Sequence, residues 1–251
     1  MPILSPTTMA RILLRSTLLL ATATPGLSQG TVPYLEAGVG HRQGDFGTPV
    51  QSRLWMGYIT CGAFGNRWDA NLSLPLLRLE RSGSGPSSRD QGLGDAVVRG
   101  LFRFLPETED GWSLDGQAAL KLANGDDAKG LGTGRTDFGG FLALHQQLGL
   151  FRWTVQAGRT QGNATEVSSE LRSGGFVWGL SGSWQFESDR WTLAYESRTA
   201  AYQGLPGARE LSLDFFHSIS SGWGMKLSVA AGLSDGGPRQ GFGLAFIRVF
   251  P

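Results

Sequence analysis

The sequence has few of the residues on which several functions depend. It holds a single cysteine, Cys61, which excludes a disulfide framework and any metal site built from cysteine pairs. The formal net charge of +1 excludes the strongly basic surface of a nucleic-acid-binding protein. No apolar run beyond position 30 reaches the ~18 residues of a membrane-spanning helix. We therefore expect no helical membrane protein, no nucleic-acid partner and no cofactor.

Glycine and alternating apolar residues are abundant instead. The 251 residues include 38 glycines, about twice the usual share, and glycine disfavours helices. After residue 32 apolar side chains recur with a period of two, as in Trp191, Leu193 and Tyr195, with polar residues between them. This alternation predicts twelve strands, at about 33–43, 51–61, 66–80, 92–105, 111–123, 135–148, 151–161, 175–187, 190–202, 208–219, 223–234 and 240–250.

The length of these segments and their connections predict the fold class. About ten residues suffice for a tilted strand to cross a bilayer, and bacterial outer-membrane barrels have even strand numbers. Every second connection is short, whereas the others are mostly longer and polar, as expected of periplasmic turns and outer loops. We predict an all-β chain whose residues 29–251 form one transmembrane, antiparallel, up-and-down β-barrel. The short connections are 62–65, 106–110, 149–150, 188–189 and 220–222.

The aromatic residues support this orientation. Most of the eight tryptophans lie within a few residues of a short turn, as an interfacial aromatic girdle requires. The last strand ends at Phe250, one residue before the end of the sequence, and resembles the assembly signal that the barrel-assembly machinery reads. The tryptophans near short turns are Trp68, Trp112, Trp153, Trp184, Trp191 and Trp223.

The N-terminus has the pattern of a secretory signal peptide over residues 1–28. Arg11 and Arg15 accompany an apolar stretch at 12–23, and no acidic residue precedes Glu36. Cleavage after Ser28 or after Ala23, and a start at Met1 or at Met9, all stay open. This segment predicts export, and with the barrel it predicts the outer membrane of a Gram-negative bacterium.

Charged residues occupy the polar face of their strands and are the candidates for lining the lumen. Both signs are present, which argues against a strongly anion- or cation-selective constriction. Twelve strands lie between the eight that side chains fill and the 16–18 of open porins, so a narrow pore and a plugged barrel both stay open. The candidates are Asp95, Arg99, Arg103, Asp115, Lys121, Asp137, His145, Arg152, Glu196, Arg198, Asp214 and Lys226, to which we add Arg248.

A few residues are of the types found in catalytic and metal sites. A lipid hydrolase at the barrel rim would use a serine and a histidine, but the adjacent His217 and Ser218 point to opposite faces of a strand. Asp126, Asp127 and Asp137 could gather a calcium ion, although their spacing is not that of an EF-hand and favours a solvated loop. We expect no catalytic residue and no metal site.

Three short motifs resemble a known family. Gly92-Leu93-Gly94-Asp95 followed by 99–104 is similar to its "GLGD…YRF" strand, and 120–126 resembles its "K-P-T-G-D" strand end, with Ala123-Asn124 in place of Pro-Thr. The stretch 130–134, with Asp137 after it, matches its "GLGTG…D" element. The family is the outer-membrane proteins of the phenol-degradation meta pathway. The resemblance implies a barrel that passes small molecules, aromatic or hydrophobic ones among them, and implies no catalytic residues.

These observations predict a function and leave two alternatives. We expect an outer-membrane channel or transporter that passes small solutes through a narrow, charged lumen, with outer-membrane lipid around it. The alternatives are a lipid hydrolase at the barrel rim and a structural or surface-interaction barrel whose loops matter more than its lumen.

Overall fold

The computed structural model describes residues 30–46, 48, 50–83, 87–162, 174–200 and 206–250, where the chain forms antiparallel strands. The expected signal peptide at 1–28 lies outside these residues. Within the described ranges no helix is long and apolar enough to cross a membrane. The strands are β1 (Val32–Gly44), β2 (Gln51–Phe64), β3 (Trp68–Ser82), β4 (Ser88–Leu93), β5 (Val97–Leu105), β6 (Trp112–Lys121), β7 (Asp137–Leu148), β8 (Phe151–Gly162), β9 (Gly174–Gln185), β10 (Asp189–Arg198), β11 (Ala208–Ser220), β12 (Trp223–Gly232) and β13 (Gln240–Val249).

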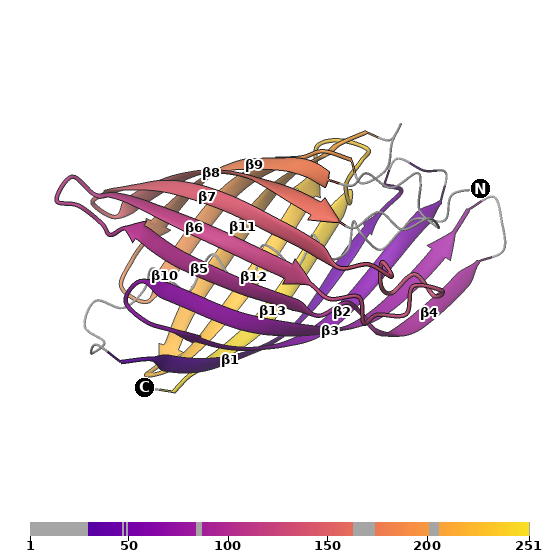
Figure 1. The fold of residues 1–251 in the computed structure, drawn as a ribbon, viewed down its shortest axis with the longest axis horizontal. Helices are drawn as coiled ribbons and strands as arrows, with labels where there is room; N and C mark the ends of the chain where they lie inside the picture. The colour runs from indigo at the N-terminus through magenta and orange to yellow at the C-terminus, as the bar shows by residue number, and fades with distance from the viewer. Residues whose placement is uncertain are drawn as a thin grey trace.

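The strands close into a barrel (Figure 1). Consecutive strands pair with each other, except that β5 pairs with β3 instead of β4. β1 closes the sheet by pairing with β13, from Tyr34↔Val249 to Gln43↔Gln240. β4 and β5 both pair with β3: β4 with the second half of β3 and β5 with the first half. Together they therefore count as one of the twelve strands of the barrel. The predicted fold class, an antiparallel barrel of twelve strands, is confirmed.

The division between β4 and β5 differs from the single strand expected at 92–105. The chain leaves the ladder at residues 94–96, opposite Pro75 of β3, whose ring nitrogen has no hydrogen to donate. The Pro75 carbonyl accepts a hydrogen bond from the Gly94 N–H at 2.9 Å. A Cβ at Gly94 would stand 2.6 Å from a Leu77 side-chain carbon, so a larger residue here would require the Leu77 side chain to shift.

The two faces of the wall differ in chemistry. Large apolar side chains point outward and are exposed, for example Leu76 at 59%, Leu142 at 57% and Val229 at 54%. A water-exposed surface rarely carries so large an apolar area, whereas the lipid-facing band of a membrane barrel consists of it. The inward positions hold buried polar and charged residues, among them Glu36, Arg99 and Asp115. The wall therefore separates a lipid-facing surface from a polar interior.

The two ends of the barrel also differ. Short turns gather at the end on the left of Figure 1, where Gly149 (φ 62°) and Gly222 (φ 77°) adopt the left-handed conformation of tight hairpins. Tryptophans pack at this end, with the rings of Trp112 and Trp153 5.3 Å apart in an edge-to-face contact. Such an aromatic belt is typical of a membrane interface. We therefore assign the short-turn end to the periplasm.

Arg248 corrects one sequence expectation. It was expected on the lumen face, but it shares the outward parity of Phe246 and Phe250. Its guanidinium carbon lies 5.2 Å from the centroid of the Trp223 ring and 5.7 Å from that of Phe250. An arginine is tolerated on the outer surface here because the interface lets its charged end reach water while its stem covers aromatic rings.

The connection at 122–136 folds against the barrel rather than into solvent. Leu131 is 1% exposed and packs with Leu54, Leu77 and Leu79, an apolar cluster inside the barrel. On the exposed side of the same connection, a hydrogen bond from Lys129 lowers the pKa of the Asp126 carboxyl. This connection therefore narrows the outer end of the lumen on the side of β2 and β3.

Candidate functional site

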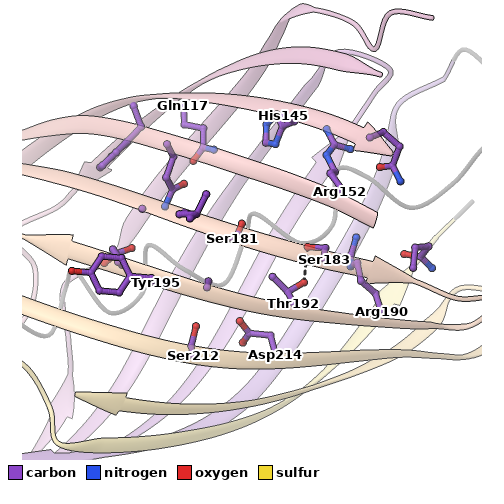
Figure 2. Close-up of a pocket in the computed structure, with 18 of the residues that line it drawn as sticks. Gln117, His145, Arg152, Ser181, Ser183, Arg190, Thr192, Tyr195, Ser212 and Asp214 are labelled. Carbon is purple, nitrogen blue, oxygen red and sulfur yellow. Dashed lines mark hydrogen bonds between the residues drawn. The ribbon is translucent and has the colours of Figure 1, made fainter. Parts of the chain in front are cut away.

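A cavity of about 670 Å³ lies inside the barrel along β7 to β11 (Figure 2). The volume is that of a small-molecule binding site, for which 300–1,000 Å³ is typical. Its wall is built from short inward side chains, among them Ser181 and Ser183 of β9 and Thr192 of β10. The Ser183 and Thr192 hydroxyls are hydrogen-bonded at 2.9 Å. Small residues at consecutive inward positions leave the space that larger ones fill elsewhere.

Charges of both signs stand around this cavity. Arg152 of β8 and Arg190 of β10 line its periplasmic end, on the two strands that flank β9 (Figure 2). Glu196 and Arg198 form an ion pair of 2.7 Å on the β10 wall. Asp214 of β11 adds a further carboxylate. The cavity wall is therefore mixed in charge along its length.

A polar cluster joins β5 to β8 at the periplasmic half of the lumen. Arg103 donates to Asp115 at 3.0 Å, and His145 Nε2 lies 3.3 Å from the second Asp115 oxygen. His145 Nδ1 and the Thr154 hydroxyl are 2.7 Å apart. Asp115, His145 and Thr154 have the residue types of a catalytic triad, but His145 and Thr154 are 5% and 7% exposed. A nucleophile so deeply buried is inaccessible to a lipid substrate, so the geometry favours a structural role.

Arg152 connects this cluster to the cavity. Its guanidinium donates to the Ser113 hydroxyl at 3.0 Å, and the Glu107 carboxylate lies 3.8 Å away. Ser113 is wholly buried on β6, whereas Arg152 also lines the cavity. Arg152 is thus anchored to the wall by Ser113 and also borders the cavity.

The opposite half of the lumen, from β1 to β5, is filled. Glu36 accepts a hydrogen bond from Tyr58 at 2.6 Å, and the Lys226 ammonium lies 3.3 Å from the same oxygen. Arg99, 7% exposed, donates to the Ser73 hydroxyl at 3.3 Å. A second, much smaller cavity of about 70 Å³ lies beside this packing, between β1–β2 and β11–β13. Large side chains on these strands occupy the space that stays empty along β9.

A third cluster fastens the connection at 122–136. Lys121 lies 3.3 Å from Asp95 and 2.8 Å from Asp137. Asp95 also accepts hydrogen bonds from the backbone N–H groups of Gly125 and Thr133, both at 2.9 Å. Asp137 is thus paired with a cation. Among the described residues no group of three or more His, Cys, Asp or Glu could hold a metal ion.

The structure distributes the predicted lumen residues among these places. Arg103, Asp115, His145 and Arg152 form one cluster, and Asp95, Lys121 and Asp137 another. Arg99 and Lys226 belong to the filled half. Of the twelve, the cavity wall includes His145, Arg152, Glu196, Arg198 and Asp214. Whether these residues line a conducting path stays a prediction.

Several lumen residues were missed from the sequence. Arg190 lines the cavity and directly precedes Trp191 in the sequence. Because Trp191 faces outward, the alternation of β10 places Arg190 inward, and this was the available signal. Glu36 is the acceptor at the centre of the filled half. The Arg42–Glu210 ion pair joins β1 to β11, which are not neighbours in the sheet. A contact across the lumen has no signature in local alternation.

No described serine is hydrogen-bonded to His217 at the barrel rim, although a β-bulge between Ser218 and Ser220 brings Ser220 into register with the outward Trp223. His217 is outward and 2.7 Å from an Asp189 oxygen, on the face that also carries Phe215. Ser218, the next residue of β11, alternates to the other face. The Asp189–His217 pair is therefore separated from this serine by the strand.

Comparisons with known proteins identify the fold. The sequence matches no model of a known protein family and no curated protein. Among solved structures, the chain is similar to an outer membrane channel from Pseudomonas putida F1, with a TM-score of 0.73 and 15% identity over 91% of this chain and 100% of that one.

Two other barrels are more distant. The translocator domain of the autotransporter NalP from Neisseria meningitidis has a TM-score of 0.59 and 12% identity, covering 97% of this chain and 96% of that chain. The KdgM porin has a TM-score of 0.56 and 8% identity, covering 88% and 100%. At these identities the likeness shows the outer-membrane barrel fold.

Proposed function

We propose that this protein is an outer-membrane channel for small solutes and that solutes pass along the β7–β11 side of the lumen. The observation that carries this proposal is the cavity of about 670 Å³ inside a closed barrel whose outer face is apolar. Two of the similar barrels are an outer membrane channel and a porin, which supports the same function. A barrel with a lipid-facing band and a belt of tryptophans belongs in the outer membrane of a Gram-negative bacterium.

The charge distribution predicts weak ion selectivity. Arg152, Arg190 and Arg198 stand on the cavity wall with Glu196 and Asp214. Strong selectivity comes from rings of one sign, which this wall does not present. We expect cations and anions to pass at rates within about tenfold of each other.

The test is the conductance of the folded protein in a planar bilayer. Ser181→Trp places an indole in the cavity and should lower conductance by about tenfold or more, because the ring occupies much of the cavity volume beside Ser181. Leu193→Trp is the matched control, since Leu193 of β10 directly follows the cavity residue Thr192, points outward and is 42% exposed. Equal conductance in both variants, or no conductance in the unaltered protein, would overturn the proposal.

The solute class is proposed from the resemblance to the phenol-degradation family together with the cavity wall. Phe141 and Val177 contribute apolar surface beside the hydroxyls of β9 and β10. Such a wall suits a small aromatic molecule with one or two polar groups. Catechol should reduce the ion current in a concentration-dependent way, and glycerol of the same concentration should not; equal effects would contradict an aromatic preference.

We also propose that the barrel has no catalytic activity and that its last strand engages the barrel-assembly machinery. Thr154 is buried, and no described serine is hydrogen-bonded to His217 of the outward Asp189–His217 pair. β13 ends at Val249 and is followed by the exposed Phe250, which lies next to the Arg248–Trp223 contact. Phospholipase assays with His217→Ala test the first point, and assembly of Phe250→Ala in cells tests the second.

A further inference from the structure

A group of arginines lies on the outer surface of the barrel near its outer end. Arg53 of β2, Arg78 of β3 and Arg89 of β4 all have outward parity on three adjacent strands. The pairing register places Arg53 opposite Glu80, and Glu80 opposite Arg89. We call Arg53, Arg78, Glu80 and Arg89 the outer arginine patch. With one carboxylate among three guanidinium groups, the patch carries two uncompensated positive charges.

The contacts within the patch leave donors available. Arg78 Nε donates to Glu80 Oε1 at 3.0 Å, and Arg89 Nε lies 3.9 Å from the same oxygen. The Arg89 side chain is 59% exposed, and that of Arg78 41%. Arg53 is exposed, and its side chain makes no hydrogen bond or ion pair with another described residue. The guanidinium groups of Arg53 and Arg89 therefore make no hydrogen bond with another described residue and keep their donors available.

The depth of the patch places it at the outer-leaflet headgroups. On β3 the outward residues Leu72, Leu74 and Leu76 form the lipid-facing band above Trp68. Arg78 follows Trp68 by ten positions, about 25 Å along the membrane normal at the usual rise and tilt of a barrel strand. The apolar band of such barrels is about 25 Å tall. The arginines therefore begin where the band ends.

This arrangement fits a phosphate group. Guanidinium forks bind phosphate oxygens through paired N–H groups, and three converging arginines supply several such donors. The residues opposite and beside them on the same face, Gln51 and Gln91, are polar and exposed. The positive charge and the polar surroundings of the patch therefore favour an anionic ligand such as a phosphate group.

Other outward arginines lack this surrounding. Arg159 on β8 and Arg209 on β11 are exposed near the outer ends of their strands. Arg159 pairs in register with Gly140, and Arg209 with Ser197, so neither faces a second arginine. They provide matched controls in which the same charge is removed from other sectors of the barrel.

We propose that the outer arginine patch is a binding site for the phosphate groups of the phosphorylated glycolipid that forms the outer leaflet. The proposal rests on the outer-membrane location proposed above, and it concerns the outer surface rather than the lumen. The lipid's acyl chains would lie along Leu74 and Leu76, below the arginines, while its phosphate meets the guanidinium groups. Charge and depth together select this lipid over a neutral one.

The experiment measures lipid binding by native mass spectrometry of the folded full chain in neutral detergent. The probes are lipid A with its phosphates, the same lipid with its phosphates removed, and inorganic phosphate at matched concentration. The unaltered protein should bind the phosphorylated lipid about tenfold or more tightly than the other two, as expected for multiple charge-assisted contacts. The double variant R53Q/R89Q should lose this preference, and R159Q/R209Q should keep it.

Each other result decides against the proposal. Equal binding of both lipids, equal loss in the two double variants, or inorganic phosphate binding as tightly as the lipid would overturn it. If R53Q/R89Q fails to fold, Glu80→Gln removes the only carboxylate of the patch and should tighten lipid binding several-fold; no gain would overturn the proposal. Conductance of the same variants in phospholipid bilayers should be unchanged, which separates this site from the channel function.

Discussion

The two halves of the lumen are built from the same alternation of inward and outward residues, yet one is filled and the other is hollow. From β1 to β5 the inward positions include Tyr34, Tyr58 and Arg99, whose side chains meet in the interior. Along β9 the inward positions include Gly179, Ser181 and Ser183, which border a cavity of about 670 Å³. Both halves are walls of antiparallel strands, and the volume of the inward side chains differs between the filled half and the cavity.

The difference also concerns water. In the filled half a buried charge depends on its protein partners, because water has no access to replace them. In the hollow half a polar group that loses a protein partner can be hydrated from the cavity. The same kind of substitution should therefore lower the free energy of unfolding more in the filled half than in the hollow half.

Removal of a buried carboxylate should show the largest difference. Glu36→Ala takes away the acceptor of Tyr58 and the partner of Lys226, and should lower the free energy of unfolding by about 3–5 kcal/mol. Glu196→Ala, on the cavity wall beside Arg198, should cost about 1 kcal/mol. Urea unfolding in lipid vesicles, followed by tryptophan fluorescence, measures both; equal losses would refute the comparison.

Truncation of the inward connection comes next. Leu131→Ala leaves a void among Leu54, Leu77 and Leu79 and should cost about 3 kcal/mol, within the usual range for a buried leucine. Protease cleavage at 122–136 should become faster in the same variant. Lys129→Ala on the exposed side of the connection is the control and should change stability by less than about 1 kcal/mol. Protease resistance equal to that of the unaltered protein would show that Leu131 does not anchor this connection.

A glycine in the filled half gives a third comparison. At Gly38 an added Cβ would stand 2.7 Å from the Tyr58 ring, so Gly38→Ala should cost about 1–3 kcal/mol as the ring shifts. At Gly57, on the neighbouring strand, an added Cβ has no atom within 4 Å, and Gly57→Ala should be neutral or slightly stabilising. Thermal unfolding of the two variants distinguishes them, and a neutral Gly38→Ala would mean that the tyrosine is loosely held.

Two serine hydroxyls give the smallest effect. Ser73→Ala removes a hydroxyl that contacts Thr60 at 2.6 Å and Arg99 at 3.3 Å, and should cost about 1–3 kcal/mol. Ser183→Ala removes the bond to Thr192 at the cavity and should cost under about 1 kcal/mol, because water can take the place of the hydroxyl. The order of the two unfolding midpoints is the result to measure, and a reversed order would contradict the role assigned to water.

Alternation and turn length were sufficient to predict the barrel, because a period of two fixes which face of a strand each residue occupies. They placed Asp115, His145 and Lys226 on the inward face, where the structure finds them buried. The prediction for Arg248 is wrong because a charged residue at the end of a strand need not face the lumen. The ring of Trp223 accommodates Arg248 on the outer face at the membrane interface. Residue type alone is ambiguous wherever a strand reaches water on its outer face.

Other features depend on contacts between distant strands. The interruption between β4 and β5 depends on Pro75 of a neighbouring strand, and the burial of Leu131 depends on residues of β2 and β3. Neither leaves a periodic pattern in its own segment. The position of the cavity likewise follows from the sum of side-chain volumes around the closed wall. Such sums require the register of every strand pair, which the sequence pattern alone does not supply.

The pairing of the first strand with the last has a kinetic consequence. Tyr34 of β1 meets Val249 of β13, so the contact that closes the wall joins residues from opposite ends of the chain. All other neighbouring pairs are local hairpins or nearly so, and can form early. Closure must wait until the final strand is available, and until then β1 and the growing edge both present unpaired N–H and C=O groups. Insertion into the bilayer is therefore expected to be slow and to require protection of these two edges until the wall is complete.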